Sequence, residues 1–203
     1  DSFLSGLFDI GSIVFLFLLA RRLYRDNRVA LLASFLLATS VLAIQYAHFM
    51  VVDPYANFFI TGALYFLAGV QLYGRKRDYA LSGLFYGMAL ATKLSIYAFA
   101  LIVALVVVYR LWRLWAAEPS FEARWSGVKQ AVVRGLLLAL AAFAAFRLGQ
   151  PDAFRGPGIF DVALSDRWLQ NAQQASQMVS GNVDFPPNDQ WTARVPLWFP
   201  WSN

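Results

Sequence analysis

The sequence predicts an all-α fold, a polytopic membrane bundle of about six transmembrane helices followed by an amphipathic helix at the outer membrane interface. Three observations support this prediction. The 203 residues are 59% hydrophobic and 14% charged, whereas a soluble domain is nearer half apolar and a quarter charged. Long apolar segments alternate with short polar connections, and basic residues concentrate in every second connection.

Six apolar segments account for the predicted helices, because a spanning helix needs about 20 such residues. Lys93 lies between the two shortest of them and favours a helical hairpin there, although one long bent helix from Tyr79 to Arg113 is the alternative. Gly83 and Gly87 form a small-residue face that lets two helices approach closely. The six segments are residues 3–20, 29–47, 55–73, 79–92, 95–112 and 128–146.

The basic residues predict how the chain is oriented, because cytoplasmic connections of membrane proteins are enriched in lysine and arginine. This rule places both termini on the non-cytoplasmic side of a plasma (inner) membrane, which six crossings satisfy. It also explains the net charge of +5 without nucleic-acid binding. The residues concerned follow the first, third and fifth segments: Arg21, Arg22, Arg25, Arg28, Arg75, Lys76, Arg77, Arg110, Arg113, Arg124, Lys129 and Arg134.

The last quarter of the chain differs in composition from the rest. We predict a transmembrane domain over residues 1–148 and an outer loop over residues 149–203, which is polar and ends in a part rich in tryptophan and proline. The chain begins at Asp1 without the features of a signal peptide, so we expect it to be part of a longer polypeptide. Apolar residues recur at helical spacing in the outer loop and predict its amphipathic helix: Phe160, Leu164, Trp168, Ala172, Ala175 and Val179.

Four ionisable residues are predicted to contribute to one polar cavity at the outer side of the membrane. His48, Asp53, Lys93 and Arg147 all fall at that end of their segments, and an ionisable group at membrane depth usually faces a wet cavity or a partner. Lys93, Arg147 and His48 would hold a lipid-linked phosphate. Asp53, together with Asp9 of the first segment, would orient these cations or a sugar hydroxyl.

Each residue also has a structural explanation. Lys93 and Arg147 are equally suited to extend toward lipid headgroups. Asp53, just before Pro54, is equally suited to cap the third helix through the N–H of Ala56 or Asn57. His48 and Asp9 can be satisfied by hydrogen bonds to neighbouring helices.

The residue types in the sequence give little support to a metal site or a bound cofactor. The chain has no cysteine, which excludes disulfides and thiolate ligands, and its single histidine argues against a multi-histidine metal or haem site. Motifs of soluble enzymes are absent. We therefore predict no metal ligands and no cofactor, while a divalent ion associated with a donor stays open.

Several short motifs resemble the integral-membrane glycosyltransferases of the protein O-mannosyltransferase and aminoarabinose-transferase group. His48-x-x-x-x-Asp53-Pro54, followed by Phe58-Phe59, resembles a family segment in which arginine is usual at the first position. Gly83-x-x-x-Gly87, followed after five residues by Lys93, resembles the family helix that comes next. The region from Gly6 to Ala38 and the stretch from Asp184 to Thr192 are also similar to parts of these transferases.

The resemblance implies inverting transfer of a sugar from a polyprenyl-phosphate donor to an acceptor outside the cytoplasm. It assigns His48, Asp53 and Lys93 to the donor-phosphate site. The family's catalytic carboxylate lies in the first outer loop, and no residue here matches it, so the catalytic residues are unknown and enzymatic activity stays open. The alternative function is a non-catalytic subunit of a large energy-transducing or photosynthetic membrane complex. Predicted partners are membrane lipids, the polyprenyl-phosphate sugar and, for the alternative, other membrane subunits.

Overall fold

A computed structural model describes residues 2–48, 51–117, 120–156, 158 and 161–179, without the side chains of residues 2, 47, 48, 178 and 179. The chain divides into two units, Asp1–Pro151 and Asp152–Asn203. The predicted ending rich in tryptophan and proline lies outside the described residues.

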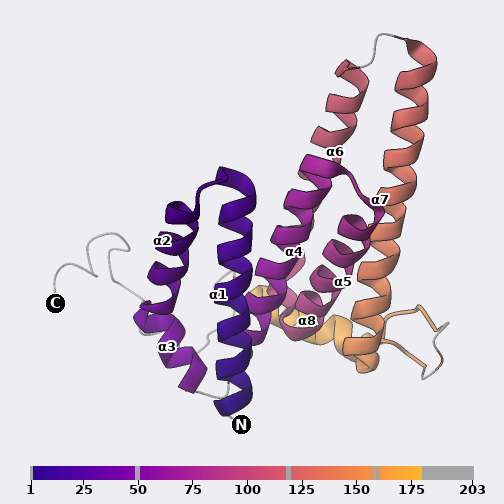
Figure 1. The fold of residues 1–203 in the computed structure, drawn as a ribbon. Helices are drawn as coiled ribbons and strands as arrows, with labels where there is room; N and C mark the ends of the chain where they lie inside the picture. Colours follow the sequence, from indigo (N-terminus) through magenta and orange to yellow (C-terminus); the bar gives the residue numbers. More distant parts are fainter. Residues whose placement is uncertain (1, 49–50, 118–119, 157, 159–160, 180–203) are drawn as a thin grey trace, which may run out of the picture. The chain divides into compact units, whose positions relative to one another are not determined.

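The first unit is a helical bundle in which the chain repeatedly reverses direction (Figure 1). The all-α membrane fold predicted from the sequence is confirmed, because no strand occurs among the described residues and several of the helices are long and apolar. The start of α1 and the end of α7 lie at the same end of the bundle (Figure 1). The helices are α1 Ser2–Tyr24, α2 Asn27–Ala38, α3 Val41–His48, α4 Asp53–Tyr73, α5 Lys76–Thr92, η1 Leu94–Ala98, α6 Phe99–Ala117 and α7 Phe121–Gly149.

In the described part of the chain, four helices are long and apolar enough to cross a membrane. They correspond to the first, third, fifth and sixth predicted segments, and the last of them starts earlier than expected because Ser120 caps it, accepting a hydrogen bond from the N–H of Ala123 at 3.3 Å. The fourth segment forms α5, whose 17 residues fall below that length. The four candidate spans are Phe3–Tyr24, Asp53–Tyr73, Leu94–Ala117 and Phe121–Gly149.

The second predicted segment is not one helix, which corrects the expectation. It breaks at Thr39 and Ser40 into α2 and α3. The Thr39 hydroxyl donates to the Phe35 carbonyl at 2.8 Å, so this side chain competes with the backbone for a helical acceptor. The Ser40 N–H bonds the Leu37 carbonyl at 3.1 Å, a tighter turn that ends α2.

Lys93 separates α5 from the next helix, as the hairpin prediction required. Its backbone is extended, with φ −149° and ψ 116°, which ends α5 and starts the short 3₁₀ turn η1. The alternative of one long bent helix is therefore wrong. At the opposite end of α5, Gly74 takes φ 63° and closes α4, a left-handed conformation that glycine adopts without steric cost.

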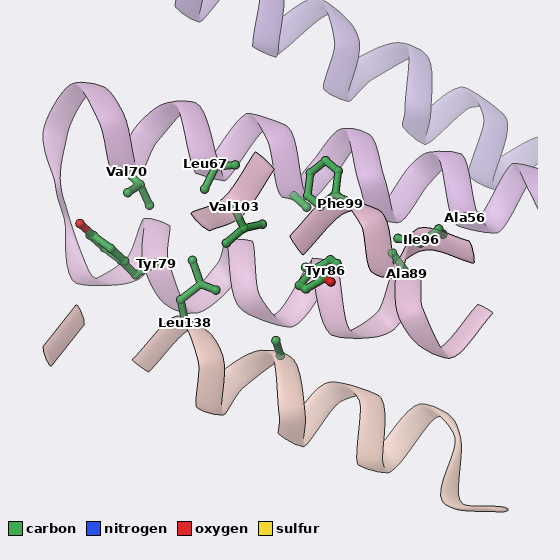
Figure 2. Close-up of a cluster of buried hydrophobic side chains, with 12 residues drawn as sticks. Ala56, Leu67, Val70, Tyr79, Tyr86, Ala89, Ile96, Phe99, Val103 and Leu138 are labelled. Carbon is green, nitrogen blue, oxygen red and sulfur yellow. The ribbon is translucent and has the colours of Figure 1, made fainter. Parts of the chain in front are cut away.

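The core of the first unit lies between α4, α5 and α7, with η1 and α6 covering it (Figure 2). The small-residue face predicted on α5 makes this packing possible. A Cβ atom added to Gly83 or to Gly87 would lie 2.1 Å from the carbonyl oxygen of Leu138 or Ala142, respectively. The backbones of α5 and α7 are therefore in direct contact, as in other membrane helix pairs built on small residues.

Aromatic rings join α1 to this core. Phe15 of α1 packs against Phe58 of α4 and against Phe85 of α5, with ring centroids 5.3 and 5.2 Å apart. Glycines make room for two of these rings, because a Cβ at Gly11 would meet Phe58 and a Cβ at Gly62 would meet Phe85. Part of the aromatic content is thus a specific contact between three helices.

The C-terminal half of α4 is bonded by arginines from three other helices. Arg22 of α1 donates to the carbonyl and to the hydroxyl of Tyr65, both at 2.7 Å. Arg110 of α6 donates to the Gln71 carbonyl at 3.1 Å. Arg134 of α7 donates to the Gly74 carbonyl at 2.6 Å. These arginines were predicted only to orient the chain, and the structure shows that they also stabilise the negative end of α4.

Replacing Arg22 tests this contribution to stability. We expect Arg22→Ala to lower the free energy of unfolding by about 1–3 kcal/mol, because the partly buried Tyr65 hydroxyl loses a charge-assisted hydrogen bond. Denaturant titration in detergent, followed by helical circular dichroism, measures the change. Arg21→Ala is the control, since Arg21 is exposed and its removal should change stability by less than about 0.5 kcal/mol. Equal losses in the two variants would contradict this assignment.

The second unit holds α8 Asp166–Val179 and a short loop that precedes it. The predicted amphipathic helix is present, although it begins at Asp166; Phe160 lies outside the described residues. Arg155 fixes the loop by pairing with Asp166 at 2.7 Å and by donating to the Leu164 carbonyl at 3.0 Å. The Ser165 hydroxyl caps α8 by accepting from the N–H of Trp168 at 3.2 Å.

Candidate functional site

A cavity of about 430 Å³ lies at the end of the bundle where α4 begins and α5 ends. We call it the Asp53 cavity. Its wall comes from α1, from the end of α2 and the break that follows it, from α3, from the first half of α4 and from the turn after α5. Apolar side chains make up part of the wall, among them Leu37, Leu42, Ile60 and Ile96. The polar residues that line it are Asp9, Ser40, Tyr46, Asp53, Asn57, Lys93 and Ser95.

The central contact of the cavity is an ion pair between Asp53 and Lys93. The Lys93 ammonium donates to Oδ1 of Asp53 at 2.7 Å, although 40 residues separate the two in the sequence. The side chains are 34% exposed for Asp53 and 45% exposed for Lys93. Asp53 is the first residue of α4, and Pro54 follows it in the first turn, where proline suits the start of a helix. The extended backbone at Lys93 directs the chain into the turn after α5.

The capping role considered for Asp53 is wrong. The N-cap of α4 is Val52, and no side chain caps this helix. The N–H of Ala56 instead bonds the Val52 carbonyl at 3.0 Å, so the Asp53 carboxylate stays available for Lys93.

Asp9 gives the cavity a second carboxylate, supplied by α1. Within the described part of the chain, Lys93 is the single cation among the lining residues and is already paired with Asp53. One ammonium against two carboxylates leaves the described wall with an excess of negative charge. Such a wall favours a ligand that offers hydroxyl donors in addition to any anionic group.

Arg147 does not join Asp53 and Lys93 in the described wall. Arg147 lies in the last turn of α7, is 6% exposed and is not among the lining residues. The α3 helix ends at His48, whose side chain lies outside the described residues. Their assignment to a phosphate site stays a prediction.

Sequence reasoning missed four polar residues of the wall as candidates. Asn57 follows Asp53 by one helical turn, a spacing that places both on one face of α4 and was visible in the sequence. Ser40, Tyr46 and Ser95 reach the cavity because of the break after α2 and the turn after α5. No group of three or more potential metal-ligating side chains occurs in the described part of the chain.

One of the comparisons with known proteins finds a match. A family model described as dolichyl-phosphate-mannose-protein mannosyltransferase matches residues 2–146. The matched region includes Asp9, Asp53 and Lys93 and ends one residue before Arg147. No curated protein and no solved structure matches the chain.

Proposed function

The chain belongs to the dolichyl-phosphate-mannose-protein mannosyltransferase family, and from this premise we propose that its Asp53 cavity binds a polyprenyl-phosphate sugar for transfer to an acceptor at the outer membrane face. A membrane glycosyltransferase of the mannosyltransferase type follows from the family. The donor, the acceptor and the face are the proposal. The observation that carries it is the 2.7 Å ion pair between Asp53 and Lys93 inside a cavity with both polar and apolar walls.

The ion pair is suited to hold the donor phosphate. An ammonium has three N–H donors, and one of them is bonded to Asp53. Asp53 therefore fixes the position of Lys93 and leaves two donors for phosphate oxygens. His48 and Arg147 are the proposed sources of further positive charge at the phosphate.

The remaining polar residues are suited to hold the sugar. A carboxylate accepts hydrogen bonds from hydroxyls, and an amide both accepts and donates, so Asp9 and Asn57 can bind a sugar ring that carries several hydroxyls. The apolar residues Leu37, Leu42 and Ile60 offer a surface for the first isoprene units of the lipid. The cavity thus matches the three chemical parts of the donor.

A transfer assay tests the function. Sealed membrane vesicles that contain the full-length protein are incubated with radiolabelled polyprenyl-phosphate mannose and an acceptor peptide. Vesicles of both orientations are compared, and transfer is expected where the face holding the Asp53 cavity is accessible. No transfer from the lipid donor would contradict the proposal and favour the non-catalytic subunit. Transfer from a soluble sugar nucleotide at the same rate would contradict the proposed donor.

Within this assay, Asp9→Asn tests the sugar contact. We expect kcat/KM to fall by roughly 10-fold, because an amide accepts a hydroxyl hydrogen bond less strongly than a carboxylate does. Arg77→Gln is the matched single-charge control, since Arg77 is exposed and does not line the cavity. Unchanged kcat/KM in Asp9→Asn would remove this residue from the donor site.

A further inference from the structure

A second concavity of about 840 Å³ lies at the turn between α1 and α2. This turn is at the opposite end of α1 from the N-terminus of the chain (Figure 1), whereas Asp9, through which α1 lines the Asp53 cavity, lies in the N-terminal half of α1. We call the second concavity the arginine pocket, and its lining is mainly polar. It is formed by Arg21, Tyr24, Arg25, Asp26, Asn27 and Arg28.

The pocket carries uncompensated positive charge. Its one carboxylate, Asp26, accepts from the N–H of Arg28 at 2.7 Å and so caps α2. The ion pairs found between described residues involve none of the three arginines of the pocket. Three guanidinium groups therefore face one carboxylate that already serves the backbone, which is the arrangement that binds an anion.

The backbone of the turn between α1 and α2 also favours the binding of an anion. Arg25 has φ 56°, in the left-handed region that is uncommon for residues other than glycine. This conformation allows α2 to begin only two residues after Arg25, so the N-terminus of α2 opens at the pocket. A helix N-terminus carries partial positive charge and exposed N–H groups, which adds to the field of the arginines.

The surroundings of the pocket indicate that the anion is a lipid. Leu23 is in the last turn of α1, and Leu31 and Leu32 are in the second turn of α2; all three are exposed apolar side chains. Tyr24 is also exposed, as expected for a ring at a membrane interface. A phosphate that carries acyl chains would place its charge among the arginines and its chains along these leucines, whereas a soluble phosphate would use only the first contact.

We propose that the arginine pocket binds the phosphate headgroup of an anionic phospholipid. Orientation of the chain by the positive-inside rule requires only that basic residues lie on this side. The rule does not require that Arg21, Arg25 and Arg28 line one concavity. Arg22 of the same turn has a different role, because it bonds Tyr65 inside the bundle. The binding is independent of the sugar-transfer proposal.

The test compares lipid retention by native mass spectrometry. The full chain is reconstituted in nanodiscs of phosphatidylcholine with a minor fraction of phosphatidylglycerol, then released. We expect phosphatidylglycerol adducts on the unaltered protein and about fivefold weaker retention for each arginine removed. The pocket variant is Arg21→Gln/Arg25→Asn/Arg28→Gln, in which asparagine tolerates the left-handed conformation.

A matched variant and three contrary results make the test decisive. Lys76→Gln/Arg77→Gln/Arg113→Gln also removes three exposed charges, all outside the pocket, and should retain the lipid. Arg21→Lys/Arg25→Lys/Arg28→Lys keeps the charge and should retain most of the binding even if the pocket variant folds poorly. Equal loss in both neutral triple variants, equal retention of phosphatidylcholine, or displacement by inorganic phosphate would overturn the proposal.

Discussion

Replacing Lys93 with alanine is expected to reduce kcat/KM for sugar transfer by at least about a hundredfold, the scale on which losing a positioned charge in an active site acts. The ammonium is the one cation in the described wall of the Asp53 cavity, so its removal leaves two carboxylates facing an anionic donor. Repulsion then adds to the lost hydrogen bonds. The transfer assay with the lipid donor measures the effect.

Asp53→Ala should act less strongly than Lys93→Ala, because it frees the ammonium without removing it. Combining the two replacements should cost far less than the sum, since both act through one contact. Arg155→Ala is the matched control. It breaks another 2.7 Å ion pair, which Arg155 forms with Asp166 in the second unit, and the two side chains of that pair are more exposed. If the losses in kcat/KM for Lys93→Ala and Asp53→Ala were additive, or if Arg155→Ala caused a comparable loss, the ion pair would have no specific role in sugar transfer.

The second large effect is expected at the contact between α5 and α7. Alanine at Gly83 or Gly87 should lower the free energy of unfolding by about 1–3 kcal/mol or more, as overpacked cores do. The added Cβ would lie 2.1 Å from a backbone carbonyl oxygen of α7 in either case. The clash can be relieved only if α5 and α7 move apart, because the atom that the added Cβ would meet belongs to the backbone and not to a flexible side chain.

Gly135→Ala is the control, because this replacement is expected to raise the free energy of unfolding instead of lowering it. A Cβ there would meet its nearest neighbour, Val107, at 3.7 Å, an ordinary contact distance. Replacing glycine by alanine inside a helix otherwise stabilises it by roughly 0.5–1 kcal/mol, so this variant should unfold at higher denaturant concentration. Stabilisation at Gly83 and Gly87 as well would show that the helices are not held by this close approach.

The features that could be predicted from the sequence are those that depend on the local effect of a single residue. Pro54 marked the start of α4, and Lys93 marked the end of α5. Gly83 and Gly87 indicated a close helix contact without naming α7 as the partner. The break at Thr39 and Ser40 was not predicted, because it interrupts a mainly apolar segment that contains neither glycine nor proline.

Contacts between distant residues could be predicted only in part. Asp53 and Lys93 were placed at the same end of their helices, and helix packing then brought them to 2.7 Å. The positive-inside rule explained why Arg22, Arg110 and Arg134 lie at one end, but it contains no information about their acceptors. Those acceptors, the carbonyls of α4, depend on which helices are neighbours.

The break between α2 and α3 has a consequence for hydration. Neither piece, of 12 and 8 residues, reaches across a hydrocarbon layer of about 30 Å. Backbone groups freed by such an interruption must find protein partners or solvent, since lipid tails offer none. The N–H groups of Thr39 and Ser40 find such partners in the carbonyls of Phe35 and Leu37. Because Ser40 also lines the Asp53 cavity, we expect water that enters the cavity to reach the backbone of this break.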